Sequence, residues 1–111
     1  MAKATFIRNG EVMTVTNSGD TAIEVGDIVS LGTRIGVSAD TIQPGDAGSV
    51  NVVGVFSLPK VGNLAINQGD AVYFVPADGV VSKTASGNIP AGYAAASAAA
   101  ADETVQIKLL G

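Results

Sequence analysis

The chain has 111 residues, of which 47% are hydrophobic and only 14% are charged. This length predicts one compact domain, and the apolar composition excludes a disordered chain. The net charge is −4, and the six cations are scattered along the sequence. Nucleic-acid binding depends on clustered basic residues that neutralise phosphates, so we expect no nucleic-acid partner.

Cys and His are absent from the sequence, and this excludes most catalytic and metal-binding arrangements. Without them the chain has no disulfide, no thiolate or imidazole metal ligand, no cysteine nucleophile and no histidine-dependent triad. No Gly-Lys dipeptide of a phosphate-binding loop occurs, nor the Asp-x-Asp-x-Asp-Gly spacing of a calcium loop. We therefore predict that the protein is not an enzyme and uses no cofactor and no metal ion.

Neither end of the chain predicts export or membrane insertion. The N-terminal residues lack the apolar core of a signal peptide. The most apolar stretch, Ala91–Ala101, is interrupted by Gly92 and Ser97 and is shorter than the roughly 18 apolar residues of a membrane helix. We expect neither a cleaved leader nor a contact with membrane.

Short β-rich runs alternate with turn residues along the whole chain. Runs of this length at spacings of about 8–12 residues are typical of an all-β sandwich or barrel. The last run has the clearest period of two, with Val105, Ile107 and Leu109 on one face and polar Gln106 and Lys108 on the other. The predicted strands are Glu11–Thr16, Asp27–Leu31, Arg34–Ser38, Ser49–Leu58, Ala71–Val75, Gly79–Lys83 and Thr104–Leu110.

Glycine and aspartate mark the turns between these runs. Gly-Asp occurs four times, and Asp78-Gly79 is the dipeptide favoured by a type I′ hairpin turn. We therefore predict a turn at Ala77–Val80. The carboxylates beside these glycines are interpreted as turn-forming side chains rather than as an acid–base pair.

Two parts of the sequence resemble each other. Gly26–Val29 followed by Ile35–Ala39 is similar to Gly69–Val72 followed by Ala91–Ala95. An acidic turn and a final strand follow in both parts, and we match Val50-Asn51-Val52 with Val105-Gln106-Ile107. This similarity predicts two related strand–turn–strand halves, whereas the alternative is that Gly-Asp turns recur in unrelated β structure.

The Ala-rich tract can be read in two ways. Alanine is the best helix former, so composition alone favours a helix over residues 93–101. The internal similarity instead favours a strand over Gly92–Ala96, followed by a turn or one short helix, and we prefer this interpretation. The tract Ala94–Ala101 carries no charged residue, and its small side chains suit a crowded interior or a subunit contact.

The aromatic residues divide into two groups. Phe56, Tyr73 and Phe74 lie in predicted strands, where packing in the core or on a strand face explains them. Phe6 lies in a short N-terminal segment that is free to reach a partner. We divide the chain into an extended arm over residues 1–8 and a single β domain over residues 9–111.

The order of several short motifs carries a resemblance to a known family. From Phe6 to Gly111 the chain resembles the small capsid decoration, or cement, proteins of tailed phages. The most specific stretches are Gly54–Lys60 and Gln68–Tyr73. The motifs are Phe-Ile-x-x-Gly-Glu-Val-Met-Thr-Val-Thr, Val-Gly-Asp-Ile-Val, Ile-Gly-Val, Gly-Val-Phe-Ser-Leu-Pro-Lys, Ile-Asn-Gln-Gly-Asp-Ala-Val-Tyr and Val-Gln-Ile-Lys-Leu-Leu-Gly, in this order.

The resemblance implies a small β-barrel-like or β-tulip-like domain that stabilises an assembled phage head from outside, often as a trimer. The implied partner is the major capsid protein, and the implied location is the outer surface of the virion after synthesis in the host cytoplasm. The plain Ala94–Ala101 tract departs from the family pattern and puts a contact role for that tract in doubt. The alternative function is a small carbohydrate- or ligand-binding β module of a larger assembly, and an enzyme is the third candidate.

Two sets of contact residues are predicted on this basis. The arm adds to the edge of a capsid subunit or of a neighbouring cement subunit through main-chain hydrogen bonds, with Phe6 and Ile7 as apolar anchors. Apolar residues beyond the needs of a small core form the homotrimer interface. The capsid or partner contacts are Ala2, Lys3, Ala4, Thr5, Phe6, Ile7 and Arg8, and the oligomer contacts are Pro59, Val61 and Leu64.

Overall fold

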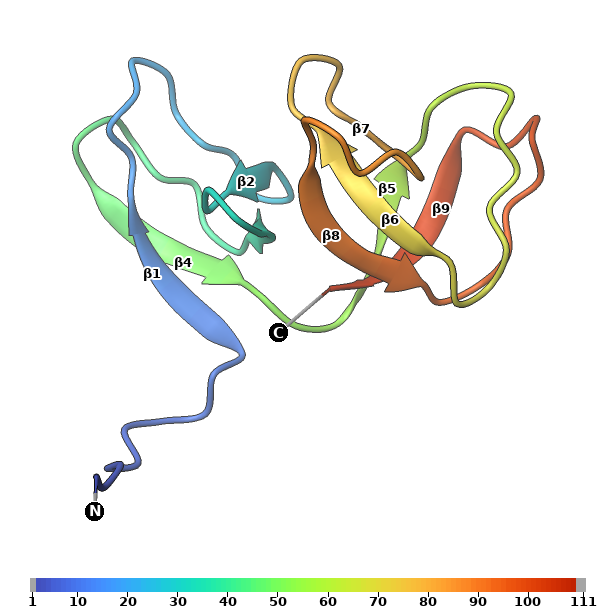
Figure 1. Cartoon of the computed structure of the whole chain (residues 1–111). Helices are drawn as coiled ribbons and strands as arrows, with labels where there is room; N and C mark the ends of the chain where they lie inside the picture. The colour runs from blue at the N-terminus through green and yellow to red at the C-terminus, as the bar shows by residue number, and fades with distance from the viewer. Residues whose placement is uncertain (1, 110–111) are drawn as a thin grey trace.

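The computed structural model describes residues 2–109, and in this part of the chain every regular element is a β-strand. Nine short antiparallel strands form two sheets that lie side by side (Figure 1). The strands are β1 (Val12–Thr16), β2 (Ile28–Ser30), β3 (Ile35–Ser38), β4 (Ala47–Asn51), β5 (Val55–Pro59), β6 (Ala71–Val75), β7 (Val80–Ser82), β8 (Ile89–Ala94) and β9 (Thr104–Leu109). The predicted all-β class is confirmed.

The sheets are not closed into the small barrel that the resemblance implies. The N-terminal sheet has the order β1-β4-β3-β2, and the C-terminal sheet has the order β5-β9-β8-β6-β7. The outer strands of the C-terminal sheet meet only through one parallel bridge, between Lys60 and Val81. Most of the outer edge of β5 therefore has no neighbouring strand within residues 2–109.

The single strand predicted over Ser49–Leu58 is wrong, because the chain changes sheets in the middle of this run. β4 ends at Asn51 and β5 begins at Val55. Between them Gly54 has φ +118°, a conformation that side-chain-bearing residues rarely adopt. The hydrophobic run thus supplies one strand to each sheet, and the end of the last predicted strand, Leu110, lies outside the described residues.

The two sheets share the same topology. The first four positions of each order correspond, so β1, β4, β3 and β2 match β5, β9, β8 and β6. Their connecting loops are also held alike: Gly26 N donates to Ser38 O, and Gly69 N donates to Ala94 O, both at 2.8 Å. β7 has no counterpart in the N-terminal sheet. Descent of the two halves from one repeated unit stays a prediction, which these matching bonds support.

The predicted match between the final strands is wrong by two residues. Val50 lies opposite Ser38 on β3, and Ile107 lies opposite Ala94 on β8. Val50 therefore corresponds to Ile107, not to Val105. The predicted match makes the connection before β9 one residue shorter than the connection before β4, whereas the observed register makes it one residue longer. Sequence similarity over three residues does not reveal this difference.

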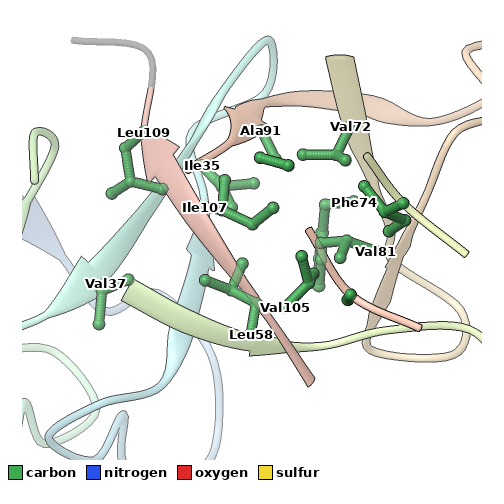
Figure 2. Close-up of a cluster of buried hydrophobic side chains, with 13 residues drawn as sticks. Ile35, Val37, Leu58, Val72, Phe74, Val81, Ala91, Val105, Ile107 and Leu109 are labelled. Atoms are coloured by element: carbon green, nitrogen blue, oxygen red, sulfur yellow. The ribbon is translucent and has the colours of Figure 1, made fainter. Parts of the chain in front are cut away.

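The core is built mainly on the inner face of the C-terminal sheet. Val105, Ile107 and Leu109 of β9 are all buried, while Gln106 and Lys108 between them are exposed, as the period of two predicts. Ile35 and Val37 of β3 belong to the same cluster, so the N-terminal sheet packs against the C-terminal one (Figure 2). The other members of the cluster are Leu58, Ile66, Val72, Phe74, Val81, Ala91, Ala94 and Ala98.

The Ala-rich tract forms no helix. β8 begins earlier than predicted, at Ile89, and ends at Ala94, after which the chain turns until Ala98 forms an isolated bridge with Ile66. Ala94 and Ala98 are buried in the core. Tertiary packing of small side chains therefore overrides the helix propensity of alanine.

Gly92 explains why β8 can lie so close to β9. It has φ +152°, and a Cβ built at this position would lie 1.9 Å from the carbonyl oxygen of Lys108. Only glycine leaves room for the backbone of β9 at this point.

The turn between β6 and β7 is also confirmed, but with a different geometry. Residues 76–79 form a four-residue turn in which Gly79 N donates to Val75 O at 2.9 Å. Gly79 has φ +70°, whereas Asp78 is not among the positive-φ residues. A type I′ turn needs positive φ at both central residues, so that part of the prediction is wrong.

Lys60 is an unusual core residue because its side chain is only 5% exposed. Its ammonium Nζ donates hydrogen bonds to the carbonyl oxygens of Val61, Leu64 and Ala100, at 3.2, 2.7 and 3.2 Å. Asn17 occupies the matching position after β1 and donates to the carbonyl oxygens of Thr21 and Ile42. Both side chains tie the loop after the first strand of a sheet to the body of that half.

We predict that Gly92→Ala lowers the free energy of unfolding by about 3 kcal/mol or more, because the methyl group meets the Lys108 carbonyl and φ becomes strained. Urea denaturation of the purified protein measures this change. Gly62→Ala is the matched control, since a Cβ there meets nothing within 4 Å. Equal stabilities of the two variants would contradict the close approach of β8 and β9.

We predict that Lys60→Met lowers the free energy of unfolding by about 2 kcal/mol, because three partly buried carbonyl oxygens lose a charged donor. The control is Lys83→Met, whose ammonium lies 3.6 Å from Asp70 Oδ2 at a partly exposed site. An exposed ion pair contributes little, so this control changes stability by less than about 1 kcal/mol. A Lys60→Met protein as stable as the control would show that Nζ does not hold the loop.

Candidate interaction surface

The N-terminal arm is the most exposed apolar part of the molecule. Residues 2–9 form no strand and all are exposed. Phe6 is 80% exposed and Ile7 is 76% exposed, and Figure 1 shows the arm running away from both sheets. Large apolar side chains on an extended terminal segment are typical of a partner-binding element. The residues predicted as partner contacts, Ala2–Arg8, therefore lie together on an accessible segment.

The arm and the rest of the chain carry opposite charge. Lys3 and Arg8 are the only charged side chains in the first ten residues. The remaining residues carry four cations and ten acidic side chains. The arm is thus a basic segment with two exposed apolar side chains, and the rest of the chain is acidic. A basic segment is attracted to acidic surfaces, including that of a second copy.

A groove of about 510 Å³ lies where the two sheets meet. Val25 stands at its rim and is 65% exposed. Its neighbours Glu24 and Asp27 are held in a turn in which Glu24 N donates to the Asp27 carboxylate at 2.9 Å. The groove is lined by Val25, Gly26, Ile28, Val37, Ser38, Ala39 and Asn51 from the N-terminal half and by Phe56, Ser57, Leu58 and Pro59 from β5.

One wall of this groove is the outer strand β5. Gly54 O accepts from Leu109 N, and Lys60 N donates to Glu103 O. Antiparallel pairing alternates, so Gly54, Phe56, Leu58 and Lys60 direct their backbone groups toward β9. The backbone groups of Val55 and Ser57 therefore point to the open edge. Pro59 also lies at an outward position, where its missing N–H removes no ladder bond.

The predicted oligomer contacts do not form one patch. Pro59 and Val61 are exposed at the end of β5, and Pro59 also lines the groove. Leu64 is partly buried against the core, and its carbonyl oxygen accepts from Lys60 Nζ. The geometry thus assigns Leu64 mainly to the loop that Lys60 holds.

Two exposed apolar residues beside the groove are not among the predicted contacts. Val55 is 54% exposed on the outer face of β5, and Val25 lies in the loop before β2. Exposed and buried positions alternate along β5, with Phe56 and Leu58 facing inward. This period of two could have identified Val55 as an exposed residue from the sequence. Val25 carries no such signal, because its exposure depends on how the two halves pack.

Two searches of the described residues, for metal-ligand clusters and for membrane-spanning helices, found nothing. Between residues 2 and 109, no three His, Cys, Asp or Glu side chains gather as metal ligands. The same span contains no helix that could cross a membrane.

The aromatic residues of the strands divide between the core and the surface. Phe74 is buried in the core, and Phe56 packs against the core. Tyr93 is exposed on the outer face of the C-terminal sheet, with Lys108 Nζ 5.8 Å from its ring centre.

Comparison with known proteins gives one result. A family model described as phage cement protein matches residues 7–109, which is nearly the whole chain. Searches of curated proteins and of solved structures gave no match.

Proposed function

The chain belongs to the phage cement protein family, and on that premise we propose that it binds the outer surface of an assembled phage head and stabilises the shell without catalysing a reaction. Membership of the family already associates the protein with the phage capsid and gives it a structural role. The further steps proposed here are the surface to which it binds, its direct partner and the residues in contact. The proposed partner is the major capsid protein, on the virion exterior.

The observation that carries this proposal is the exposed arm. Phe6 and Ile7 expose more of their side chains than any other large apolar residue of the described chain. Burying two such side chains on a partner removes apolar surface from water at roughly 25 cal/mol per Å². Extended segments also bind through main-chain hydrogen bonds when they add to a sheet edge. We therefore propose residues 2–8 as the attachment element.

Repetition strengthens attachment. A shell presents many equivalent sites, so linked copies of a small domain bind far more tightly than one copy does. We propose that the copies associate as a homotrimer and that Pro59 and Val61, exposed at the end of β5, contribute to this association. Leu64 supports them from the core side of the same loop.

A second candidate, a carbohydrate- or ligand-binding module, draws on the groove between the sheets. Its volume of about 510 Å³ falls in the range of small-molecule sites. The lining is mostly aliphatic and includes no charged side chain, which favours an apolar occupant over a saccharide.

We predict that the double variant Phe6→Ser/Ile7→Ser binds undecorated heads at least about tenfold more weakly than the natural protein, because both apolar anchors are lost. Co-sedimentation of purified protein with heads measures the binding. The thermal unfolding temperature should not change, since both side chains lie outside the core.

Thr5→Ser is the matched control for this variant, because it changes the same arm without removing an apolar anchor. It should bind heads like the natural protein. Equal binding by all three proteins would rule out the arm as the attachment element. Absence of head binding by the natural protein, together with capture of a small ligand, would favour the groove-based function.

A further inference from the structure

We propose that the groove between the sheets receives the N-terminal arm of a second copy of this chain, with residues 5–8 added as a strand along the open edge of β5. The inference deepens the proposed function and rests on it in treating the arm as the binding element. It goes further by placing residues 5–8 of the arm on a neighbouring copy rather than on the capsid subunit. Loss of Phe6 and Ile7 then weakens head binding because the bound copies are no longer linked to one another.

The edge of β5 offers the main-chain groups that such a strand needs. Val55 and Ser57 direct their N–H and C=O groups away from β9, as the alternation of the β5–β9 hydrogen bonds shows. At the far end of this edge, Val61 N already donates to Val81 O at 2.9 Å. The parallel Lys60–Val81 bridge occupies the carbonyl of Pro59, which has no N–H. The open main-chain groups are therefore those of Val55 and Ser57, and an added segment of about four residues is long enough to pair with them.

The side chains of the arm match the two faces of this edge. Adjacent residues of a strand point to opposite faces, so the two anchors lie on opposite sides of the extended sheet, with Phe6 on the groove side and Ile7 on the other. On the groove side the neighbours are Phe56 and Leu58. On the other side the neighbour is Val55, which is 54% exposed without the arm. Partly buried Phe56 and exposed Val55 thus offer apolar surface to the two anchors, whereas Leu58 is already buried in the single chain.

Charge favours the same occupant. The arm carries Lys3 and Arg8 and no acidic residue, whereas the body carries ten acidic residues against four cations. Glu24 and Asp27 lie within two residues of the exposed Val25 at the groove rim, although neither lines the groove itself. A basic segment from a second copy is therefore attracted toward this rim, and the attraction weakens as salt is added.

The direction of the arm points to a second copy rather than to the same chain. Glu11 O accepts from Val52 N at 3.0 Å, which continues the β1–β4 pairing beyond Val12. From there the arm continues away from both sheets (Figure 1). An arm that enters the groove of the next copy makes a head-to-tail contact, and such contacts close into a ring when the rotation allows it.

The absence of cysteine from the natural chain permits a direct test. One preparation of the full chain carries Phe6→Cys and another carries Val25→Cys, and the two are mixed and oxidised. We expect the mixed disulfide between the two variants to exceed by at least fivefold the disulfide between Phe6→Cys and Met13→Cys, a control position on the N-terminal sheet. Equal yields would overturn the inference.

A single chain that carries both Phe6→Cys and Val25→Cys separates the two possible sources of the arm. Disulfide-linked oligomers support exchange between copies. A disulfide that forms within one chain, with no linked oligomer on a denaturing gel, would show that the groove binds its own arm and would overturn the proposal.

Proline at the open edge supplies a second test. Ser57→Pro removes an outward N–H without breaking a bond to β9, and it should reduce the mixed disulfide by about tenfold. The matched control is Thr14→Pro, because Thr14 takes the same place on β1 of the N-terminal sheet, with an outward N–H. Thr14→Pro should leave the yield unchanged, and an equal loss in both variants would contradict a role of the β5 edge.

Head binding distinguishes failure of this inference from failure of the proposed function. If the natural protein coats heads but the cysteine variants give no preferred arm–groove disulfide, the proposed function stays intact and the inference is overturned. If the cysteine variants form the arm–groove disulfide but the natural protein does not bind heads, the inference stays intact and the proposed function is overturned.

Discussion

The packing of β3 against the inner face of the C-terminal sheet is the interaction on which the arrangement of the molecule depends. β9 supplies that face with three buried apolar side chains in alternation, Val105, Ile107 and Leu109. Ile35 and Val37 join the same cluster, so β3 joins the two halves through the core of the C-terminal sheet. The residues buried outside this cluster in the N-terminal half are Ile42, Val50 and Val52. The hydrophobic effect therefore favours association of the two halves, because a unit of half this length buries only a small fraction of its apolar surface by itself.

The shared core also determines what stays exposed. The chain leaves the N-terminal sheet at Asn51 and starts β5 four residues later, at the outer position of the second sheet. The edge of β5 thus faces the loop before β2, and a groove remains between them. An exposed strand edge normally invites unwanted pairing. Pro59 and the Lys60–Val81 bridge limit the far end of this edge, and the proposed arm contact would use the remainder.

Much of the fold could be predicted from the sequence, because periodicity and turn residues are local signals. The alternation of β9, the strand at Ala71–Val75 and the turn before β7 are examples. The break inside Ser49–Leu58 could not be predicted, since both sheets need apolar residues there and only the packing shows where the chain crosses. The Ala-rich tract likewise depends on contacts, as Ala94 and Ala98 are buried by residues distant in sequence. At the interaction surface, the arm was predictable from its composition, whereas the groove arises only when the halves meet.

The central claim is that this small two-sheet domain coats the outside of a phage head and reaches its neighbours through its arm. A cryo-electron microscopy map of undecorated heads incubated with the purified protein tests this claim most directly. The account predicts density for both sheets on the outer surface, with an extended strand beside β5 that continues to Val12 of an adjacent copy. A head surface without added density, or an arm that lies far from any β5 edge, would contradict it.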